Sequence, residues 1–149
     1  MMGTAAPAED LLQRLLGAVN SHRLDDLPAC FSRDYLNETP VHPQRGFRGR
    51  DQVRKNWLEI FSQVPDLRAH VQRSAAKDDT LWTEWEMAGT RRDGAPFLMR
   101  GVVIFRVTDG LVSSARFYLE PVEDASGDVN AAVSRVLGRN PDSREEAAS

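Results

Sequence analysis

The chain has 149 residues and a net charge of −3, and charged residues make up 28% of it. This length suits one domain with a core of its own. The mixed charges exclude a basic surface for nucleic acid or an anionic membrane, and no apolar run approaches the roughly 20 residues of a transmembrane helix. The lone cysteine, Cys30, excludes an internal disulfide, and the first residues lack the pattern of a secretion signal. We therefore expect a cytoplasmic protein.

Helical patterns dominate the first half of the chain, and they are interrupted by an irregular segment rich in proline and glycine. The helices are predicted from apolar residues at helical spacing and from residues suited to capping. In chain order, the expected elements are a disordered tail over residues 1–8, a helix opening at Glu9, a short helix capped by Asp25, a short strand before Pro40, a helix from Arg50 to Pro65, and a strand over residues 67–75.

The stretch from Thr80 to Pro121 has the pattern of a three-stranded antiparallel meander. Apolar residues alternate with others at period two, and Asp-Gly pairs at Asp93-Gly94 and Asp109-Gly110 fall where the chain must reverse. A sheet of this size is stable when one face is covered, so the preceding helices are expected to cover it. Residues 9–123 are thus expected to form one domain.

Residues 124–149 are expected to contain a linker, a short C-terminal helix and a polar tail. The helix is predicted from an amphipathic pattern in which Val129, Val133, Val136 and Leu137 share one side. The last residues, GRNPDSREEAAS, have a composition typical of disorder.

Helices first and a bent antiparallel sheet last indicate an α+β fold. The segments NSHRLDDL, GFRGRDQV, EWEMAGT and FRVTDGLVSSARFYLE occur in an order and at a spacing that resemble the nuclear transport factor 2-like superfamily, in its SnoaL-like polyketide cyclase branch. The resemblance covers about residues 9–123. It implies a cone-shaped barrel, with N-terminal helices packed on a strongly curved antiparallel sheet around a small-molecule pocket. It also implies that dimers are common.

Period two sorts the strands of the meander into two faces. One face is nearly all apolar, and we assign it inward because inward charges would cost desolvation free energy. The residues predicted to face inward are Thr83, Trp85, Met87, Phe97, Met99, Gly101, Val103, Phe105, Ala115, Phe117 and Leu119. Arg116 and Glu120 have outward parity.

Ketosteroid isomerases share the fold that the resemblance implies, and they use a carboxylate base with an oxyanion hole of Tyr and protonated Asp. The aligned positions here hold Leu15 for the Tyr, Thr39 for the base and Val103 for the Asp. The chain therefore lacks the groups of that mechanism.

Limonene-epoxide hydrolases resemble the chain more closely at one place. Their water-holding Tyr-x-Asn matches Tyr35 and Asn37. At the positions where these hydrolases have an Arg and two Asp, this chain has Trp85, Met87 and Phe117. The proton-transfer groups of the hydrolases are therefore absent from this chain.

Two residues are candidate catalytic acid/base groups. SnoaL-like cyclases use an acidic residue on the last strand, where this chain has Glu120; a one-residue bulge would turn that residue inward. His42 lies where the family has residues at the pocket mouth, and an imidazole there exchanges protons near neutral pH. The alternative is that His42 is an exposed loop residue between two prolines.

A small hydrophobic molecule is the expected ligand. Tyr35 and Asn37 either hydrogen-bond this ligand or anchor their own loop. The full set of predicted ligand-binding residues is Tyr35, Asn37, Trp57, Trp85, Met87, Met99, Val103 and Phe117. No His, Cys, Asp or Glu cluster has the spacing of metal ligands, and no glycine-rich loop suits a nucleotide phosphate, so neither a metal nor a cofactor is expected.

The outward face of the meander predicts a homodimer. Its apolar residues would leave a patch that a soluble monomer rarely exposes, and pairable charges of both signs surround the patch. These apolar residues are Trp82, Leu98, Val102, Ile104 and Tyr118.

Three functions therefore stay open: a lyase, isomerase or cyclase-type enzyme, a non-catalytic ligand-binding protein, and a dimeric interaction module. Fold resemblance alone does not establish catalysis.

Overall fold

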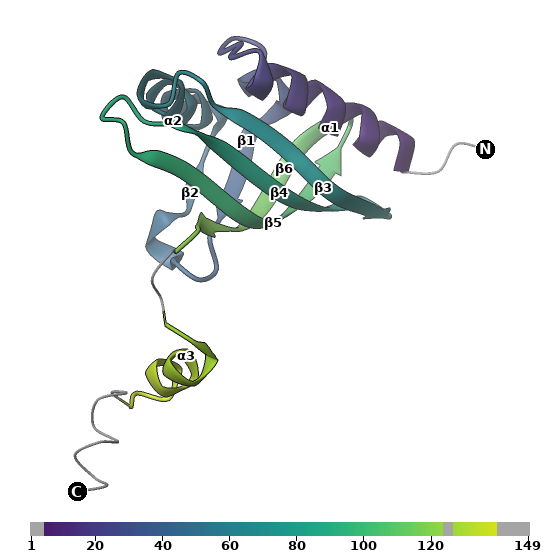
Figure 1. The fold of residues 1–149 in the computed structure, drawn as a ribbon. Coiled ribbons are helices and arrows are strands. Elements are labelled where there is room, and N and C mark those ends of the chain that lie inside the picture. The colour runs from purple at the N-terminus through teal and green to yellow at the C-terminus, as the bar shows by residue number, and fades with distance from the viewer. Residues whose placement is uncertain (1–4, 124–126, 140–149) are drawn as a thin grey trace, which may run out of the picture.

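A curved sheet carries two helices on one of its faces (Figure 1). The computed structural model describes residues 5–123 and 127–139, so the residues predicted as linker or tail at 1–4, 124–126 and 140–149 lie outside the described residues. The elements are α1 (Ala5–Asn20), the 3₁₀ turn η1 (Pro28–Cys30), β1 (Phe31–Glu38), the 3₁₀ turn η2 (Pro43–Arg45), β2 (Phe47–Arg48), α2 (Arg50–Gln63), β3 (Arg68–Lys77), β4 (Thr80–Thr90), β5 (Pro96–Thr108), β6 (Leu111–Pro121) and α3 (Val129–Val136).

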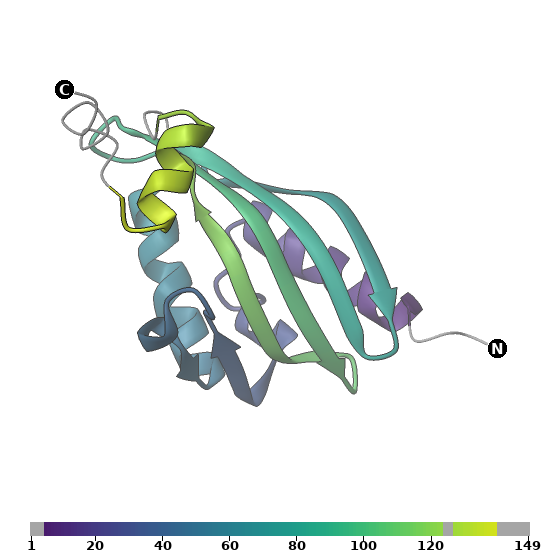
Figure 2. The ribbon, with the colours of Figure 1, turned by 90° about the horizontal axis from the view of Figure 1, so that it is seen from below.

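The strands form a six-stranded sheet in the order β2-β1-β6-β5-β4-β3. The sheet curves around α1 and α2 without closing into a complete barrel, and β2 and β3 are its edges (Figures 1 and 2). The predicted α+β fold class is confirmed. The sheet was expected to be antiparallel throughout, but β1 runs parallel to β6.

The predicted meander is β4, β5 and β6. The second Asp-Gly pair forms its tighter turn, because Asp109 and Gly110 both have positive φ angles, of 53° and 76°. This is the backbone combination that a two-residue hairpin turn with the twist of the strands requires.

Two predicted elements near the N-terminus have different limits in the structure. Helix α1 begins at Ala5 and not at Glu9, because Ala8 packs into the core and extends the buried side of the helix by one turn. The short helix predicted after Asp25 is reduced to the turn η1, because Phe31 already pairs with Val112 of β6 and so belongs to β1.

The predicted assignment of strand faces is confirmed at Trp85 and at Arg116. Trp85 is buried, whereas Arg116 is exposed. The Trp85 indole N–H donates to Thr83 Oγ1 at 2.6 Å, and Thr83 Oγ1 donates to the Val103 carbonyl oxygen at 2.6 Å. Burial of Trp85 with its polar atom satisfied stabilises the fold by about 4–6 kcal/mol.

The predicted C-terminal helix is present as α3. It begins after Asp128, whose carboxylate accepts a hydrogen bond from the Ala131 backbone N–H at 3.0 Å. It lies on the side of the sheet opposite α1 and α2 (Figure 1). Its predicted apolar side, including Val129 and Val136, is exposed and does not join the core. In the part of the chain that the structure describes, no helix is long and apolar enough to cross a membrane.

At Gly101, strand β5 approaches β6 so closely that a larger residue should destabilise the fold. Gly101 has φ of 154°, and a Cβ atom added there would lie 2.0 Å from the Tyr118 carbonyl oxygen. We expect Gly101→Ala to lower the free energy of unfolding by about 2–4 kcal/mol, measured by urea denaturation. Gly17→Ala is the control: it lies in α1 with open space around it, and should raise stability by about 0.5–1 kcal/mol. Unchanged stability of Gly101→Ala would contradict the close approach of the two strands.

Candidate functional site

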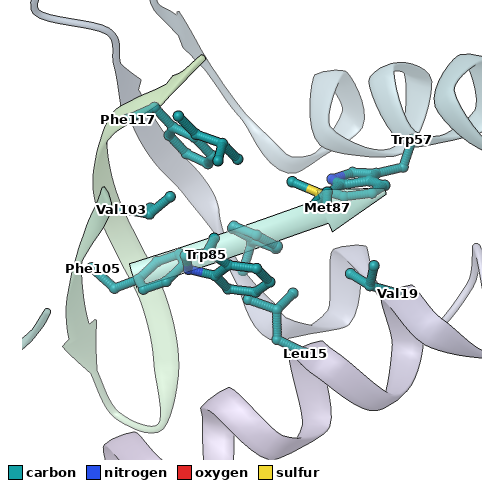
Figure 3. A pocket seen from close by; sticks show the side chains of 10 residues that line it. Leu15, Val19, Trp57, Trp85, Met87, Val103, Phe105 and Phe117 are labelled. Atoms are coloured by element: carbon teal, nitrogen blue, oxygen red, sulfur yellow. The ribbon is translucent and has the colours of Figure 1, made fainter. Parts of the chain in front are cut away.

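Apolar side chains from both helices and the sheet enclose a small cavity beneath α1 and α2 (Figure 3). The volume of this deep cavity is about 30 Å³, roughly the space of one water molecule. A ring-bearing ligand therefore does not fit there. The residues that line it are Leu15, Val19, Phe31, Trp57, Trp85, Met87, Val103, Phe105, Phe117 and Leu119.

A larger opening, the mouth pocket, lies between α2, the segment that links β1 to β2, and the ends of β4, β5 and β6. Its volume is about 270 Å³, close to the lower end of the roughly 300–1,000 Å³ typical of small-molecule sites. It shares Trp57, Met87 and Phe117 with the deep cavity, so the two spaces meet at these side chains. The mouth pocket is lined by Phe31, Tyr35, Asn37, Thr39, His42, Arg45, Phe47, Val53, Asn56, Trp57, Ile60, Met87, Met99, Phe117, Leu119 and Glu120.

Tyr35 and Asn37 form a buried polar pair in the wall of the mouth pocket. The Tyr35 hydroxyl donates to Asn37 Oδ1 at 2.7 Å. Burial raises the pKa of Tyr35 far above its usual range, so the hydroxyl stays protonated and remains a donor. Tyr35 is itself held by edge-on contacts with Phe31 and Phe47. The pair therefore fixes the orientation of the Asn37 amide.

The segment after β1 is a tight loop that holds His42 over the pocket. The His42 backbone N–H donates to the Thr39 carbonyl oxygen at 2.8 Å, and Thr39 Oγ1 donates to the His42 carbonyl oxygen at 2.7 Å. Pro40 and Pro43 restrict the backbone on both sides. These restraints place the imidazole in a defined position.

His42 and Glu120 lie side by side at the pocket rim. Glu38 of β1 lies opposite Arg116 of β6. Because these strands are parallel, both run toward the same edge of the sheet. The turn after Glu38 brings His42 to the end of β6, where His42 Nε2 lies 2.8 Å from Glu120 Oε1. A carboxylate oxygen only accepts hydrogen bonds, so this approach is favourable when Nε2 carries a proton. The neutral imidazole then keeps its free lone pair on Nδ1.

Glu120 lines the mouth pocket although β6 has no bulge beside it, the feature that the sequence analysis considered necessary to turn this residue inward. It lies opposite Arg100 in regular pairing, and the register shift between β5 and β6 is at Arg106 and Val107, far along the strand. Its parity remains outward. It lines the pocket at the rim, where it meets His42.

The predicted ligand-binding residues divide between the two spaces. Trp85 and Val103 line the deep cavity and not the mouth pocket. The other six residues line the mouth pocket: Tyr35, Asn37, Trp57, Met87, Met99 and Phe117. The roles proposed for these residues from sequence remain predictions.

Sequence analysis missed two polar residues of the mouth pocket, Arg45 and Asn56. The position of Asn56 could have been inferred from the sequence. It falls at helical spacing with Val53 and Ile60, which lie on the inner side of α2. No such signal marked Arg45, because η2 begins at Pro43 in a segment without regular periodicity.

Within residues 5–123 and 127–139, no group of His, Cys, Asp or Glu side chains is arranged to hold a metal ion. Burial raises the pKa of the Cys30 thiol, so this cysteine is poorly suited to act as a nucleophile.

Comparisons with known proteins place the chain in a family. A model described as SnoaL-like domain matches residues 12–115. A comparison with curated proteins gave no match.

Solved structures share the fold at low sequence identity. An LEH-like epoxide hydrolase from Mycobacterium tuberculosis is 17% identical, with a TM-score of 0.67 and coverage of 89% of this chain and 97% of that one. A second M. tuberculosis protein, in complex with estradiol-17β-hemisuccinate, is 20% identical, with a TM-score of 0.63 and coverage of 75% and 92%. A protein with a ketosteroid isomerase-like fold from Catenulispora acidiphila, in complex with trimethylamine, is 13% identical, with a TM-score of 0.63 and coverage of 78% and 86%.

These structures establish likeness of fold. The family model spans most of the helices and strands described above, and on that ground the chain belongs to the family of SnoaL-like domain proteins.

Proposed function

We propose that the mouth pocket binds a small hydrophobic molecule and that His42, paired with Glu120, moves a proton on it in a lyase, isomerase or cyclase-type reaction. The observation that carries this proposal is the 2.8 Å approach of the two side chains at the rim of an apolar pocket. The fold neighbours named above include an epoxide hydrolase and a complex with a steroid ester, which is consistent with a pocket for apolar compounds.

The two side chains would have different parts in this reaction. His42 Nδ1 accepts the proton and later returns it, while the Glu120 carboxylate stabilises the imidazolium that forms in between. Glu120 also holds the imidazole in one tautomer. A pair of this kind would supply acid/base chemistry without the proton-transfer residues of ketosteroid isomerases and limonene-epoxide hydrolases.

A ligand screen tests binding. We expect at least one compound in a panel of steroids, terpenoids and aromatic polyketides to raise the melting temperature, because a ligand at a hundredfold excess over its Kd stabilises by about 2.7 kcal/mol. Trp57→Ala should abolish the shift relative to its own unliganded melting temperature, since Trp57 lines the mouth pocket. Leu58→Ala is the matched control, because Leu58 is exposed on the same helix. Failure of the whole panel would count against a ligand pocket.

Proton transfer is tested with the panel compound that stabilises the protein most. In D₂O, ¹H NMR should show deuterium entering that compound, and His42→Gln should slow the exchange by about 10²–10⁴-fold because it removes the base. Glu120→Gln should slow it as well, since the imidazolium loses its carboxylate partner. Both variants should keep the thermal shift with the ligand. Exchange at the wild-type rate in His42→Gln would leave a non-catalytic binding protein as the better interpretation.

The outer face of the sheet supports a second proposal, a homodimer. Neither α1 nor α2 covers this face (Figure 2). Trp82 is 50% exposed there, and Ile104 lies directly opposite it on β5. Ion pairs flank the apolar residues, with Glu86 bonded to Arg100 at 2.9 Å and Arg116 bonded to Glu38 at 3.2 Å. A twofold partner presents the same apolar residues and charges of both signs, so the face is complementary to itself.

Oligomeric state tests the dimer. Sedimentation at micromolar concentration should give a dimer for the wild-type chain and a monomer for Trp82→Lys, because the new charge would have to be desolvated in the interface. Leu58→Lys is the control, since Leu58 is 52% exposed on α2 and not on the sheet. A wild-type monomer under these conditions would refute the dimer.

A further inference from the structure

The mouth pocket has polar side chains at its rim and apolar side chains where it meets the deep cavity. His42 and Glu120 lie at the rim. The residues that line both spaces, called the pocket floor from here on, are Phe31, Trp57, Met87, Phe117 and Leu119. None of these five side chains is charged, and their only strong hydrogen-bond donor is the Trp57 indole N–H. Burial of a polar group against this floor would cost desolvation free energy, so a ligand is oriented with its apolar end inward and its polar end at His42.

Aromatic contacts hold the Trp57 part of the floor in place. Trp57 of α2 packs against Phe61, with ring centroids 5.4 Å apart, and Phe61 stacks on His22 at 4.4 Å. His22 Nε2 in turn lies 3.0 Å from the Leu67 carbonyl oxygen. Each ring is supported by the next, so the Trp57 indole has little room to move aside when a ligand enters.

Met87 differs from the other floor residues, because its side chain is neither aromatic nor branched. It is 8% exposed, and Figure 3 shows it on the same side of the deep cavity as Trp57, with Phe117 across from both. Its neighbour on β5 is Met99, which lines the mouth pocket and not the deep cavity. A shorter residue at position 87 would therefore open the floor without removing a ring from the core.

We infer that Met87 ends the mouth pocket and sets the length of ligand that fits between the floor and His42. The mouth pocket holds about 270 Å³ and the deep cavity beyond Met87 about 30 Å³, so a ligand longer than the mouth pocket keeps its excess carbon atoms in water. An apolar end that rests on the floor also fixes which ligand atom lies beside His42 Nδ1. Met87 is thus a specificity-determining residue, for ligand length and for the position at which a proton moves. This inference rests on the proposed function, to which it adds the feature that limits the substrate.

A series of 4-alkylphenols, from 4-ethylphenol to 4-octylphenol, tests this limit by isothermal titration calorimetry. The phenol hydroxyl both donates and accepts hydrogen bonds, so it suits the polar rim, and the alkyl chain points to the floor. For the wild-type chain we expect the Kd to fall about fourfold with each added methylene until the chain reaches Met87, because each one leaves water. Beyond that length the Kd should stay level or rise. The chain length at which this happens is the break point.

Met87→Ala should move the break point to longer chains. The substitution removes Cγ, Sδ and Cε from the floor and connects the mouth pocket to the deep cavity, which together make room for about three more methylenes in a closely packed site. Met87→Val removes less of the side chain and should move the break point by a smaller step. Met99→Ala is the matched control: it removes the same atoms from the wall of the mouth pocket, so it should leave the break point at the wild-type chain length.

The outcomes separate this inference from the proposed function. A break point that stays at the wild-type length in both Met87 variants, or that moves as far in Met99→Ala, would overturn the inference and leave the ligand pocket standing. So would affinity that keeps rising through 4-octylphenol in the wild-type chain. Absence of binding by every alkylphenol would overturn the inference and count against the proposed ligand pocket. If Met87→Ala does not fold, Met87→Val decides, because valine is well suited to a strand.

Discussion

The candidate site depends on the parallel pairing of β1 with β6. Parallel strands end at the same edge of a sheet, so the turn after Glu38 lies near the end of β6. An antiparallel partner would have sent that loop in the opposite direction, away from Glu120. The same pairing carries Tyr35 and Asn37 into the pocket wall, because β1 buries both of them beneath the loop. One strand direction therefore assembles the polar residues of the site.

The apolar filling of the cone explains why these residues gather at its mouth. Trp85, Phe105 and Val103 occupy the space beneath α1 and leave a cavity for little more than one water molecule. The indole N–H of Trp85 is bonded to Thr83, so this filling leaves no polar atom of that ring unsatisfied. Apolar packing and polar side chains thus occupy different parts of the cone, with the packing beneath α1 and the polar side chains at the rim.

The sequence predicts the structure best where apolar residues recur at the regular spacing of a strand or a helix. Alternation in β4, β5 and β6 fixes which side chains face inward, and helical spacing fixes the inner side of α2, so Trp57, Met87 and Phe117 could be assigned to a pocket before the fold was known. Alternation does not encode whether a strand pairs in parallel. The contact between His42 and Glu120 therefore could not be predicted, although each was a candidate by itself. Arg45 lies in a 3₁₀ turn without a period, and no pattern placed it at the pocket.

Position at the rim also constrains how this pair can work. The side chains of His42 and Glu120 are 33% and 41% exposed, so water reaches both in the absence of a ligand. Water screens the charge of Glu120 and weakens its hold on an imidazolium. In the proposed reaction, a bound apolar ligand would cover both groups and lower the local dielectric, which would strengthen their interaction while the proton moves. Under the proposed function, binding of the apolar ligand would in this way contribute to the proton transfer between the ligand and His42.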